Sequence, residues 1–223
     1  YTSPIFGVRG TNDAAITNGA AASVDPGTRF APTVAGTART NTFSITNSGN
    51  EVLTISGSGL SDSTHFSVSG LPASVATGGV SNFTVRFAPT AAGDHFTVLR
   101  MTNNAPGSPF VLNLAGLGYV VDVLPNNGPY VGGNTVIVTN GYFGTITNVV
   151  VGSTGVVPTA SGSNWFSIVM PALGASGAVT LVVQTSDNGN TTLANAYTYN
   201  PQGTINLPIN PNSGSWTGGY PVA

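Results

Sequence analysis

In the stretch SNFTVRF, residues 81–87, polar and apolar side chains alternate from Asn82 onward. Phe83, Val85 and Phe87 fall on one face of an extended chain, and the polar residues between them fall on the other. In FTVLRM, residues 96–101, Thr97, Leu99 and Met101 similarly alternate with Val98 and Arg100. Turn-forming clusters separate such runs: NSGN at 47–50, ATGG at 76–79, NNAPGS at 103–108 and SDNGN at 186–190. This pattern of short strands predicts an all-β protein built from β-sandwiches.

Charged residues are scarce along the whole chain. They make up 5% of the 223 residues, whereas a typical globular domain has roughly a quarter. Lys is absent, and all five Arg lie between residues 1 and 100. A surface of Thr, Ser, Asn and Gly lacks the charge that keeps a concentrated cytosolic protein from self-association. Such a surface is typical of an extracellular or cell-surface module that carries sugar or packs permanently against neighbouring chains.

The composition also excludes several classes of protein. Without clustered Lys and Arg, the chain lacks the cations that nucleic-acid binding requires. Without Cys it has neither disulfides nor thiolate chemistry. No apolar run approaches the ~18 residues of a membrane span. Because the chain opens at Tyr1 with no initiator Met, we expect a processed or partial chain.

One segment of the sequence occurs twice. PNNGPYVGGNTVIV, residues 125–138, returns 86 positions later as PNSGSWTGGYPVA, residues 211–223. The identical pairs are Pro125 and Pro211, Gly128 and Gly214, Gly132 and Gly218, Gly133 and Gly219, and Val136 and Val222. The glycines are expected to take positive φ in the tight turns of an opening hairpin, and Pro125 is expected to end its first strand.

This repeat divides the chain into units. A boundary near Gly116-Leu117-Gly118 leaves a very short linker between residues 1–118 and 119–204. We expect these to be two sandwiches docked end to end with restricted bending. Residues 205–223 would be the opening strands of another copy, and an isolated hairpin is marginally stable at best. Either the chain is a piece of a longer protein that contains a further complete domain, or another subunit completes these strands.

Four segments of the first unit carry a resemblance to a known family. They are IFGVRGTNDAAITNG at 5–19, NTFSITNSGNEVLTISG at 41–57, FSVSGLPASVATGGVSNFTVRFAPTAAG at 66–93 and NNAPGSPFVLNLAGLG at 103–118. On these segments the unit resembles the choice-of-anchor D domain, a Hydin-type immunoglobulin-like domain of surface and ciliary proteins. Ala105 departs from the pattern, since the family usually has an acidic residue in its last turn.

Three segments of the second unit carry another resemblance. They are PNNGPYVGGNTVIVTNGYFG at 125–144, IVMPA at 168–172 and NAYTYN at 195–200, with its paired Tyr197 and Tyr199. On these segments the unit looks like an IPT/TIG domain, also an immunoglobulin-like sandwich. The resemblance implies a structural, spacing or adhesive role outside the cell. In one intracellular branch it implies DNA binding, which the charge-poor surface argues against.

Candidates for catalysis or metal binding are few. His65 and His95 are the only histidines, and with Asp62 and Asp94 nearby in the sequence a metal or acid–base site is conceivable. We expect instead two histidines at strand ends with no shared site. No nucleophile elbow, zinc-protease, P-loop or dinucleotide motif is present. The sequence therefore indicates no enzyme and no cofactor.

Two further motifs lie in turns or strands. Asp187, with Asn188 and Asn190, resembles part of a calcium loop, but one carboxylate is too few for Ca²⁺, so a plain hairpin turn is favoured. Asn82 and Asn190 begin N-glycosylation sequons, which at this Ser and Thr content are no commoner than chance. We expect Asn82 on the outward face of its strand and Asn190 in a loop, so both would be accessible.

Exposed aromatic residues would suit a platform for sugars. The candidates are Trp165, Trp216, Tyr130, Tyr142 and Tyr220. Packing in the core or between domains is the favoured alternative. Tyr130 and Trp216 occupy equivalent positions in the two repeats, which a repeated junction contact would explain.

These observations predict tandem immunoglobulin-like β-sandwiches that form a structural module of an extracellular filament, appendage or surface coat. The expected partners are copies of the chain or sister subunits, together with covalent glycans. The alternative is an adhesin, or a carbohydrate-binding accessory or spacer region, within a large secreted protein.

Overall fold

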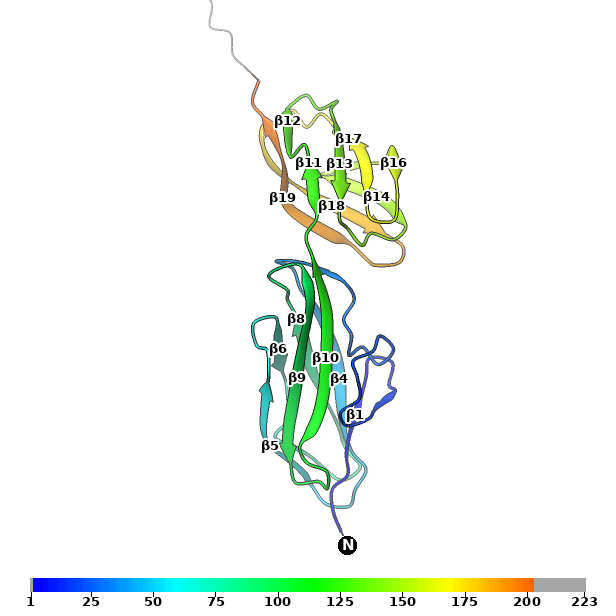
Figure 1. Cartoon of the computed structure of the whole chain (residues 1–223), viewed down its shortest axis with the longest axis vertical. Coiled ribbons are helices and arrows are strands. Elements are labelled where there is room, and N and C mark those ends of the chain that lie inside the picture. Colours follow the sequence, from blue (N-terminus) through cyan, green and yellow to red (C-terminus); the bar gives the residue numbers. More distant parts are fainter. Residues whose placement is uncertain (1, 203–223) are drawn as a thin grey trace, which may run out of the picture.

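The chain forms two β-sandwiches stacked end to end along its long axis (Figure 1). The computed structural model describes residues 2–202, and these contain strands and no helix. The all-β prediction is therefore confirmed. Since none of the described residues is helical, none forms a helix that could cross a membrane. The expected opening strands of a further copy, residues 205–223, lie outside the described residues, as do Pro211, Gly214, Trp216, Gly218, Gly219 and Tyr220.

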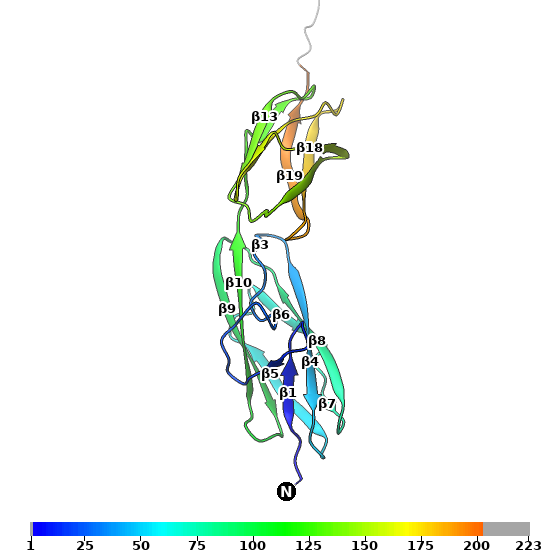
Figure 2. The same ribbon diagram turned by 90° about the vertical axis from the view of Figure 1, so that its right-hand side faces the viewer.

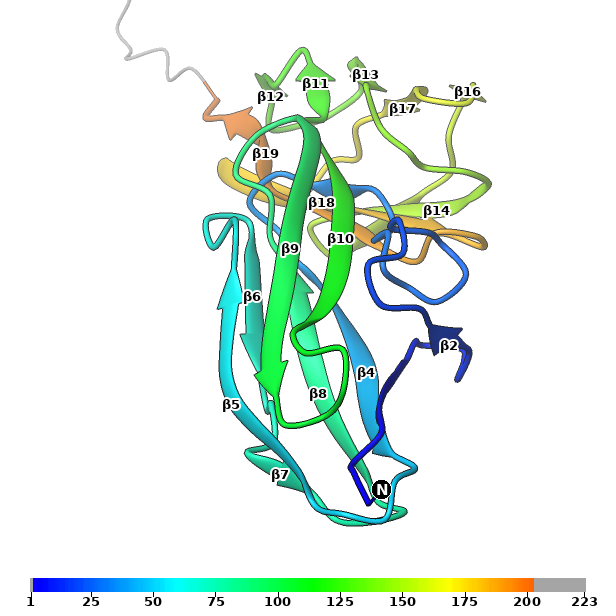
Figure 3. The same cartoon turned by 60° about the horizontal axis from the view of Figure 1, so that its bottom comes forward.

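The first sandwich contains two five-stranded sheets that face each other (Figure 3). One sheet has, in spatial order, β2 (Ala15–Ile16), β1 (Phe6–Arg9), β4 (Arg39–Asn47), β8 (Val80–Phe87) and β6 (Phe66–Ser69). The other has β3 (Thr33–Val34), β10 (Phe110–Tyr119), β9 (Gly93–Asn103), β5 (Leu53–Leu60) and β7 (Ser74–Val75).

The second sandwich pairs a four-stranded with a five-stranded sheet. The smaller sheet has β11 (Asp122–Leu124), β13 (Thr135–Thr139), β17 (Phe166–Val169) and β16 (Ala160–Ser161). The larger has β12 (Asn127–Pro129), β19 (Thr191–Asn200), β18 (Gly177–Thr185), β14 (Ile146–Val151) and β15 (Thr154–Val156).

Both sandwiches have the strand connectivity of the immunoglobulin fold. In the first, the strand order β1-β4-β8-β6 faces β10-β9-β5, and in the second β11-β13-β17-β16 faces β19-β18-β14. Five short strands, β2, β3, β7, β12 and β15, are left out of this count. The remaining seven strands of each domain, numbered along the chain, place one, two, five and four in one sheet and three, six and seven in the other. The prediction of tandem immunoglobulin-like β-sandwiches is confirmed by this connectivity.

The core of the first sandwich follows the alternation of its strands. Phe83, Val85 and Phe87 on β8 are buried, whereas Asn82 on the same strand is exposed. Phe87 packs against Phe66 with ring centroids 4.9 Å apart. Apolar burial of this kind, at about 25 cal/mol per Å², is the main favourable contribution to folding.

In the second sandwich, two tyrosines of β19 occupy the core. The rings of Tyr197 and Tyr199 are buried and pack edge to face with centroids 5.0 Å apart. Each buried hydroxyl has an acceptor: Tyr197 donates to Asn134 Oδ1 at 2.9 Å, and Tyr199 donates to the Pro171 carbonyl at 2.7 Å. The pair thus fills the core without leaving its polar ends unsatisfied.

The segment expected to be a tight opening hairpin has a different structure. β11 and β13 are antiparallel neighbours, but the chain between them crosses to the other sheet, where β12 pairs in parallel with β19. Gly132 and Gly133 have φ of 70° and 87°, as turns of positive φ require. Gly128 lies within β12 and is not among the glycines of positive φ. It is glycine because a Cβ there would lie within 3.0 Å of the Tyr197 hydroxyl.

Candidate functional site

The two sandwiches meet at a short junction (Figure 2). β10 continues to Tyr119, one residue past the expected boundary, and β11 begins at Asp122, so only Val120 and Val121 connect them. Val34 of the first sandwich packs against the hydrophobic core of the second. The Tyr119 and Tyr142 rings, one from each sandwich, have centroids 5.2 Å apart. A short connection with contacts on both sides restricts bending between the sandwiches.

The turn between β18 and β19 supplies the polar part of the junction. Arg39 of the first sandwich donates from Nη2 to the Asn188 carbonyl at 3.0 Å. Asn188 in turn donates from Nδ2 to the Tyr142 carbonyl at 3.0 Å. One turn therefore contacts both the first sandwich and the loop that carries Tyr142.

Asp187 holds this turn in place. Its carboxylate accepts hydrogen bonds from the Ser186 hydroxyl and, at 2.9 Å, from the Thr145 backbone N–H. These bonds, the one from Ser186 foremost, hold the pKa of Asp187 below its ordinary value. Among the described residues, no three or more His, Cys, Asp or Glu side chains are grouped so as to hold a metal ion. The geometry is that of a hydrogen-bonded hairpin turn.

Shortening Val34 should loosen the junction. Val34→Ala removes apolar contact with the second core at a cost of about 1 kcal/mol, so a wider range of angles between the sandwiches is expected. Because the chain has no Cys, spin labels at Ser58→Cys and Ser176→Cys, one in each sandwich, would report the distance distribution. Val24→Ala, on an exposed loop, should leave that distribution unchanged. An equally narrow distribution in both variants would contradict the role of Val34.

Tyr130, proposed as a junction aromatic, lies at the other end of the second sandwich. It follows β12, and its hydroxyl donates to Gln202 Oε1 at 2.8 Å, just past the end of β19. It therefore does not contact the first sandwich. Sequence reasoning did not single out Tyr119, Val34 or Arg39 for the junction, and the brevity of the linker was the only signal available.

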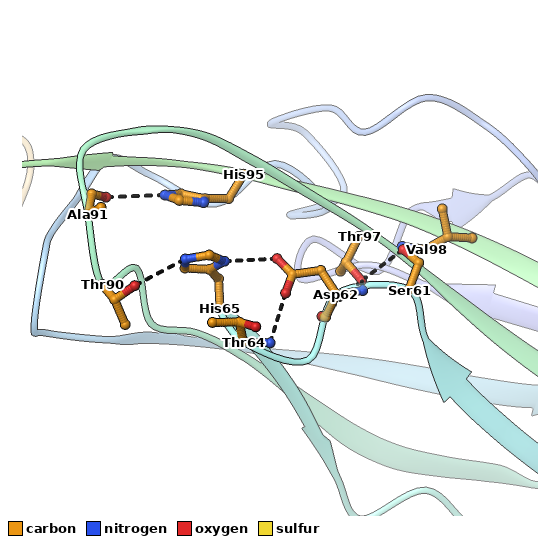
Figure 4. A network of polar contacts seen from close by, with 9 residues as sticks. All are labelled: Ser61, Asp62, Thr64, His65, Thr90, Ala91, His95, Thr97 and Val98. Carbon is orange, nitrogen blue, oxygen red and sulfur yellow. Dashed lines mark hydrogen bonds and ion pairs between the residues drawn. The ribbon is translucent and has the colours of Figure 1, made fainter.

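At one end of the first sandwich, the rings of His65 and His95 lie against each other, with their planes tilted by 32° (Figure 4). Their ring centroids are 3.9 Å apart. The two histidines, expected at separate strand ends, are therefore in contact. That they form no metal or acid–base site stays a prediction. Phe66 of β6 pairs with Phe87 at the end of β8, and a short loop then leads to β9. This pairing brings His65, directly before β6, next to His95, near the start of β9, although 30 positions separate them in the sequence.

Hydrogen bonds fix the orientation of both imidazoles. His65 donates from Nδ1 to Asp62 Oδ2 at 2.9 Å, and its Nε2 lies 3.2 Å from the Thr90 hydroxyl. His95 donates from Nε2 to the Ala91 carbonyl at 3.1 Å. The contacts with residues 90 and 91 attach the loop between β8 and β9 to the stacked rings (Figure 4).

The acidic residues near the histidines have different partners. Desolvation is the largest single influence on Asp62 and acts to raise its pKa, but hydrogen bonds from the His65 side chain and from the Thr64 and His65 N–H groups together hold that pKa below its ordinary value. Asp94 lies 3.8 Å from Arg29 Nη1, in an exposed ion pair worth little. The carboxylate that orients an imidazole is therefore Asp62.

The lowered pKa of Asp62 has a consequence in acid. Its stabilising contribution is present above the unfolded-state value near 3.9 and is lost as the pH falls through the lower folded-state value. Asp62→Asn should therefore be less stable than the wild type at pH ~6, and the gap should close toward pH ~2. Denaturant titrations across this range measure it, with exposed Asp25→Asn as the control. A gap that does not change with pH would contradict this assignment.

Both sequon asparagines are exposed. Asn82 faces outward on β8, where its Oδ1 accepts a hydrogen bond from the Ser44 hydroxyl at 2.8 Å. Asn190 precedes β19 and, with Arg39 and Tyr119, lines a groove of about 250 Å³ at the junction. A glycan on Asn190 would therefore lie between the sandwiches. Glycosylation itself stays a prediction.

Comparison with known proteins gives matches among solved structures only. No family model and no curated protein matches the chain. The extracellular region of plexin A4 is 14% identical, with a TM-score of 0.32, over 75% of this chain and 17% of that one. A PapD-like domain of human CEP192 is 14% identical, with a TM-score of 0.35, over 52% and 84%. The D00–D0 domain of intimin is 10% identical, with a TM-score of 0.34, over 88% and 100%. This chain thus spans under a fifth of the plexin A4 region.

Proposed function

We propose that the chain is a structural module of an extracellular filament, appendage or surface coat built from repeated immunoglobulin-like domains. The observation that carries this proposal is the junction, where a two-residue connection, the buried side of Val34 and the Tyr119–Tyr142 contact restrain two sandwiches end to end. A chain of domains joined in this way keeps a defined length and direction, which a filament or a spacer requires.

The domain families belong to the same proposal. We assign the first sandwich to the choice-of-anchor D group and the second to the IPT/TIG group on their sequence motifs. The fold supports this assignment, since the paired Tyr197 and Tyr199 fill the core on the last strand and Val136 and Val138 begin the second strand with both side chains buried.

The surface of the first sandwich suits contact with uncharged partners. On the outer face of the β4–β8–β6 sheet, hydroxyl and amide groups bond across neighbouring strands: Ser44 to Asn82 at 2.8 Å, and Ser69 with Thr84 at 2.7 Å. Polar groups arranged in register can hydrogen-bond to a second chain or carry glycans. The proposed partners are therefore copies of this chain, sister subunits or covalent glycans, with no nucleic acid, cofactor or catalytic step.

Native material tests the proposal. It should either carry glycans on Asn, Ser or Thr, or bury more than about 1,000 Å² per domain against other chains. Mass spectrometry detects the glycans, and analytical ultracentrifugation measures the association of chains. Association should change little between low and high salt, because screening acts on charges that this surface mostly lacks. A native protein that is unmodified and stays monomeric at high concentration would defeat the proposal.

A second candidate function is display or binding within a large secreted adhesin or carbohydrate-binding protein. The observation that favours it is a cavity beside the junction, which Tyr142 lines together with two asparagines. Filaments in the native preparation favour the first function, and saccharide binding by single chains favours the second.

A further inference from the structure

A cavity of about 460 Å³ opens on the second sandwich at the end that faces the first. Two loops form it. The loop after β13 supplies Asn140, Gly141 and Tyr142, and the loop before β17 supplies Ser163 and Asn164. The Gly141 N–H donates to the Asn164 carbonyl at 3.1 Å, so the loops are tied together. Small-molecule sites usually have volumes of about 300–1,000 Å³.

The polar lining presents groups that both donate and accept hydrogen bonds. Asn140 donates from Nδ2 to Asp122 Oδ2 at 2.6 Å, which fixes the amide and leaves its oxygen as the remaining acceptor. Ser163 and Asn164 are exposed and add a hydroxyl and a second amide to the cavity. Such a set matches the hydroxyl groups of a saccharide, which donate and accept in turn.

An aromatic ring completes the lining. Tyr142 is 48% exposed, so about half of it is available to a ligand. Its position is fixed by packing on Tyr119 and by the hydrogen bond from Asn188 to its backbone carbonyl. A ring held in this way loses little side-chain entropy when it stacks on the apolar C–H face of a sugar.

Charge limits the class of ligand. The described residues that line the cavity include no charged side chain, and the Asp122 carboxylate lies beside the lining through its hydrogen bond from Asn140. All five Arg belong to the first sandwich, and Arg39, which reaches the second, donates to the Asn188 carbonyl. Phosphate or carboxylate groups would find no cation in the lining and would be repelled by Asp122. The chemistry therefore selects an uncharged ligand rather than a nucleotide or an acidic glycan.

We infer that this cavity binds a short, neutral saccharide, stacked on Tyr142 and hydrogen-bonded to Asn140, Ser163 and Asn164. The inference rests on the second candidate function, for which it names the site and the ligand class. It does not depend on the structural role, because every residue that lines the cavity belongs to the second sandwich.

An array of neutral and acidic oligosaccharides, probed with the full chain, tests the inference. We expect binding to at least one neutral class, such as glucans, mannans, xylans or galactans. Against the bound sugar, Tyr142→Ala and Asn164→Ala should each lower the affinity about tenfold or more in calorimetry. Tyr130→Ala, at the opposite end of the domain, should change it less than about twofold.

The two pocket variants guard against different artefacts. Tyr142 also packs at the junction, so its loss alone could act by moving the sandwiches, whereas the exposed amide of Asn164 can be removed without that contact. Three results would overturn the inference. They are no binding to any neutral sugar, binding to acidic sugars only, and an affinity that is unchanged in both variants. Analytical ultracentrifugation of the same variants reports their assembly state, so failure of the sugar site and failure of the structural role are distinguishable.

Discussion

Gly128→Ala should destabilise the second sandwich by about 2–3 kcal/mol. The backbone there does not have positive φ, so alanine brings no conformational penalty of its own. The cost comes from space: the new methyl would lie within 3.0 Å of the Tyr197 hydroxyl, and Tyr197 is buried with its ring against Tyr199. The hydroxyl cannot retreat without breaking its bond to Asn134.

A double-mutant cycle separates this cause from a general effect of the substitution. Tyr197→Phe removes the obstructing atom and should cost about 1 kcal/mol through its lost hydrogen bond. The loss of stability in the double variant should then be smaller than the two single losses added together, by about 1 kcal/mol or more. Gly59→Ala, on a strand where a Cβ meets nothing within 4 Å, is the control and should be nearly neutral. If urea titrations show that the losses of unfolding free energy in the two single variants simply add in the double variant, the clash is refuted.

In strong base, the second sandwich should lose about 2–3 kcal/mol of stability as the pH rises from about 10 to about 12. Burial, with a smaller contribution from Tyr197, raises the pKa of Tyr199 from 10.0 to about 12. The folded state therefore holds the phenol proton more tightly than the unfolded state does. The stabilisation is fully present below pH ~10 and is lost as the pH rises through the folded-state value.

Tyr199→Phe should remove most of this alkaline loss. The variant lacks the hydrogen bond to the Pro171 carbonyl, so it should start about 1 kcal/mol less stable at pH ~8 and then fall less steeply. Tryptophan fluorescence follows the unfolding, since the first sandwich contains no Trp. Tyr142→Phe, on the surface, is the matched control and should keep the wild-type profile. Parallel pH profiles for wild type and Tyr199→Phe would contradict the assignment.

The strands of the core could be predicted because their pattern is local. Phe83, Val85 and Phe87 alternate with polar residues, and alternation with period two has one physical solution, an extended strand with a buried face. The turns at Gly132 and Gly133 could be predicted for the same reason, since positive φ favours glycine at single positions.

Contacts between distant segments could not be predicted in this way. Gly128 looked like a turn glycine, but its role depends on Tyr197, which is 69 positions later in the chain. His65 and His95 looked unrelated, because nothing in the sequence says that β6 pairs with the end of β8. The cavity at Tyr142 likewise needs two loops that the sequence places some twenty residues apart.

By itself, therefore, the sequence determined the fold class, the alternation that forms the cores, the charge-poor surface and the near absence of a linker. The tertiary structure alone decided that β12 crosses to the other sheet of the second sandwich and pairs with β19, that Val34, Arg39 and Tyr119 contact the second domain, and that the two histidine rings lie against each other. The physical reason is that side-chain periodicity and turn preference act over a few neighbouring residues. Pairing between strands and docking between domains depend on free energies summed over residues far apart in the chain.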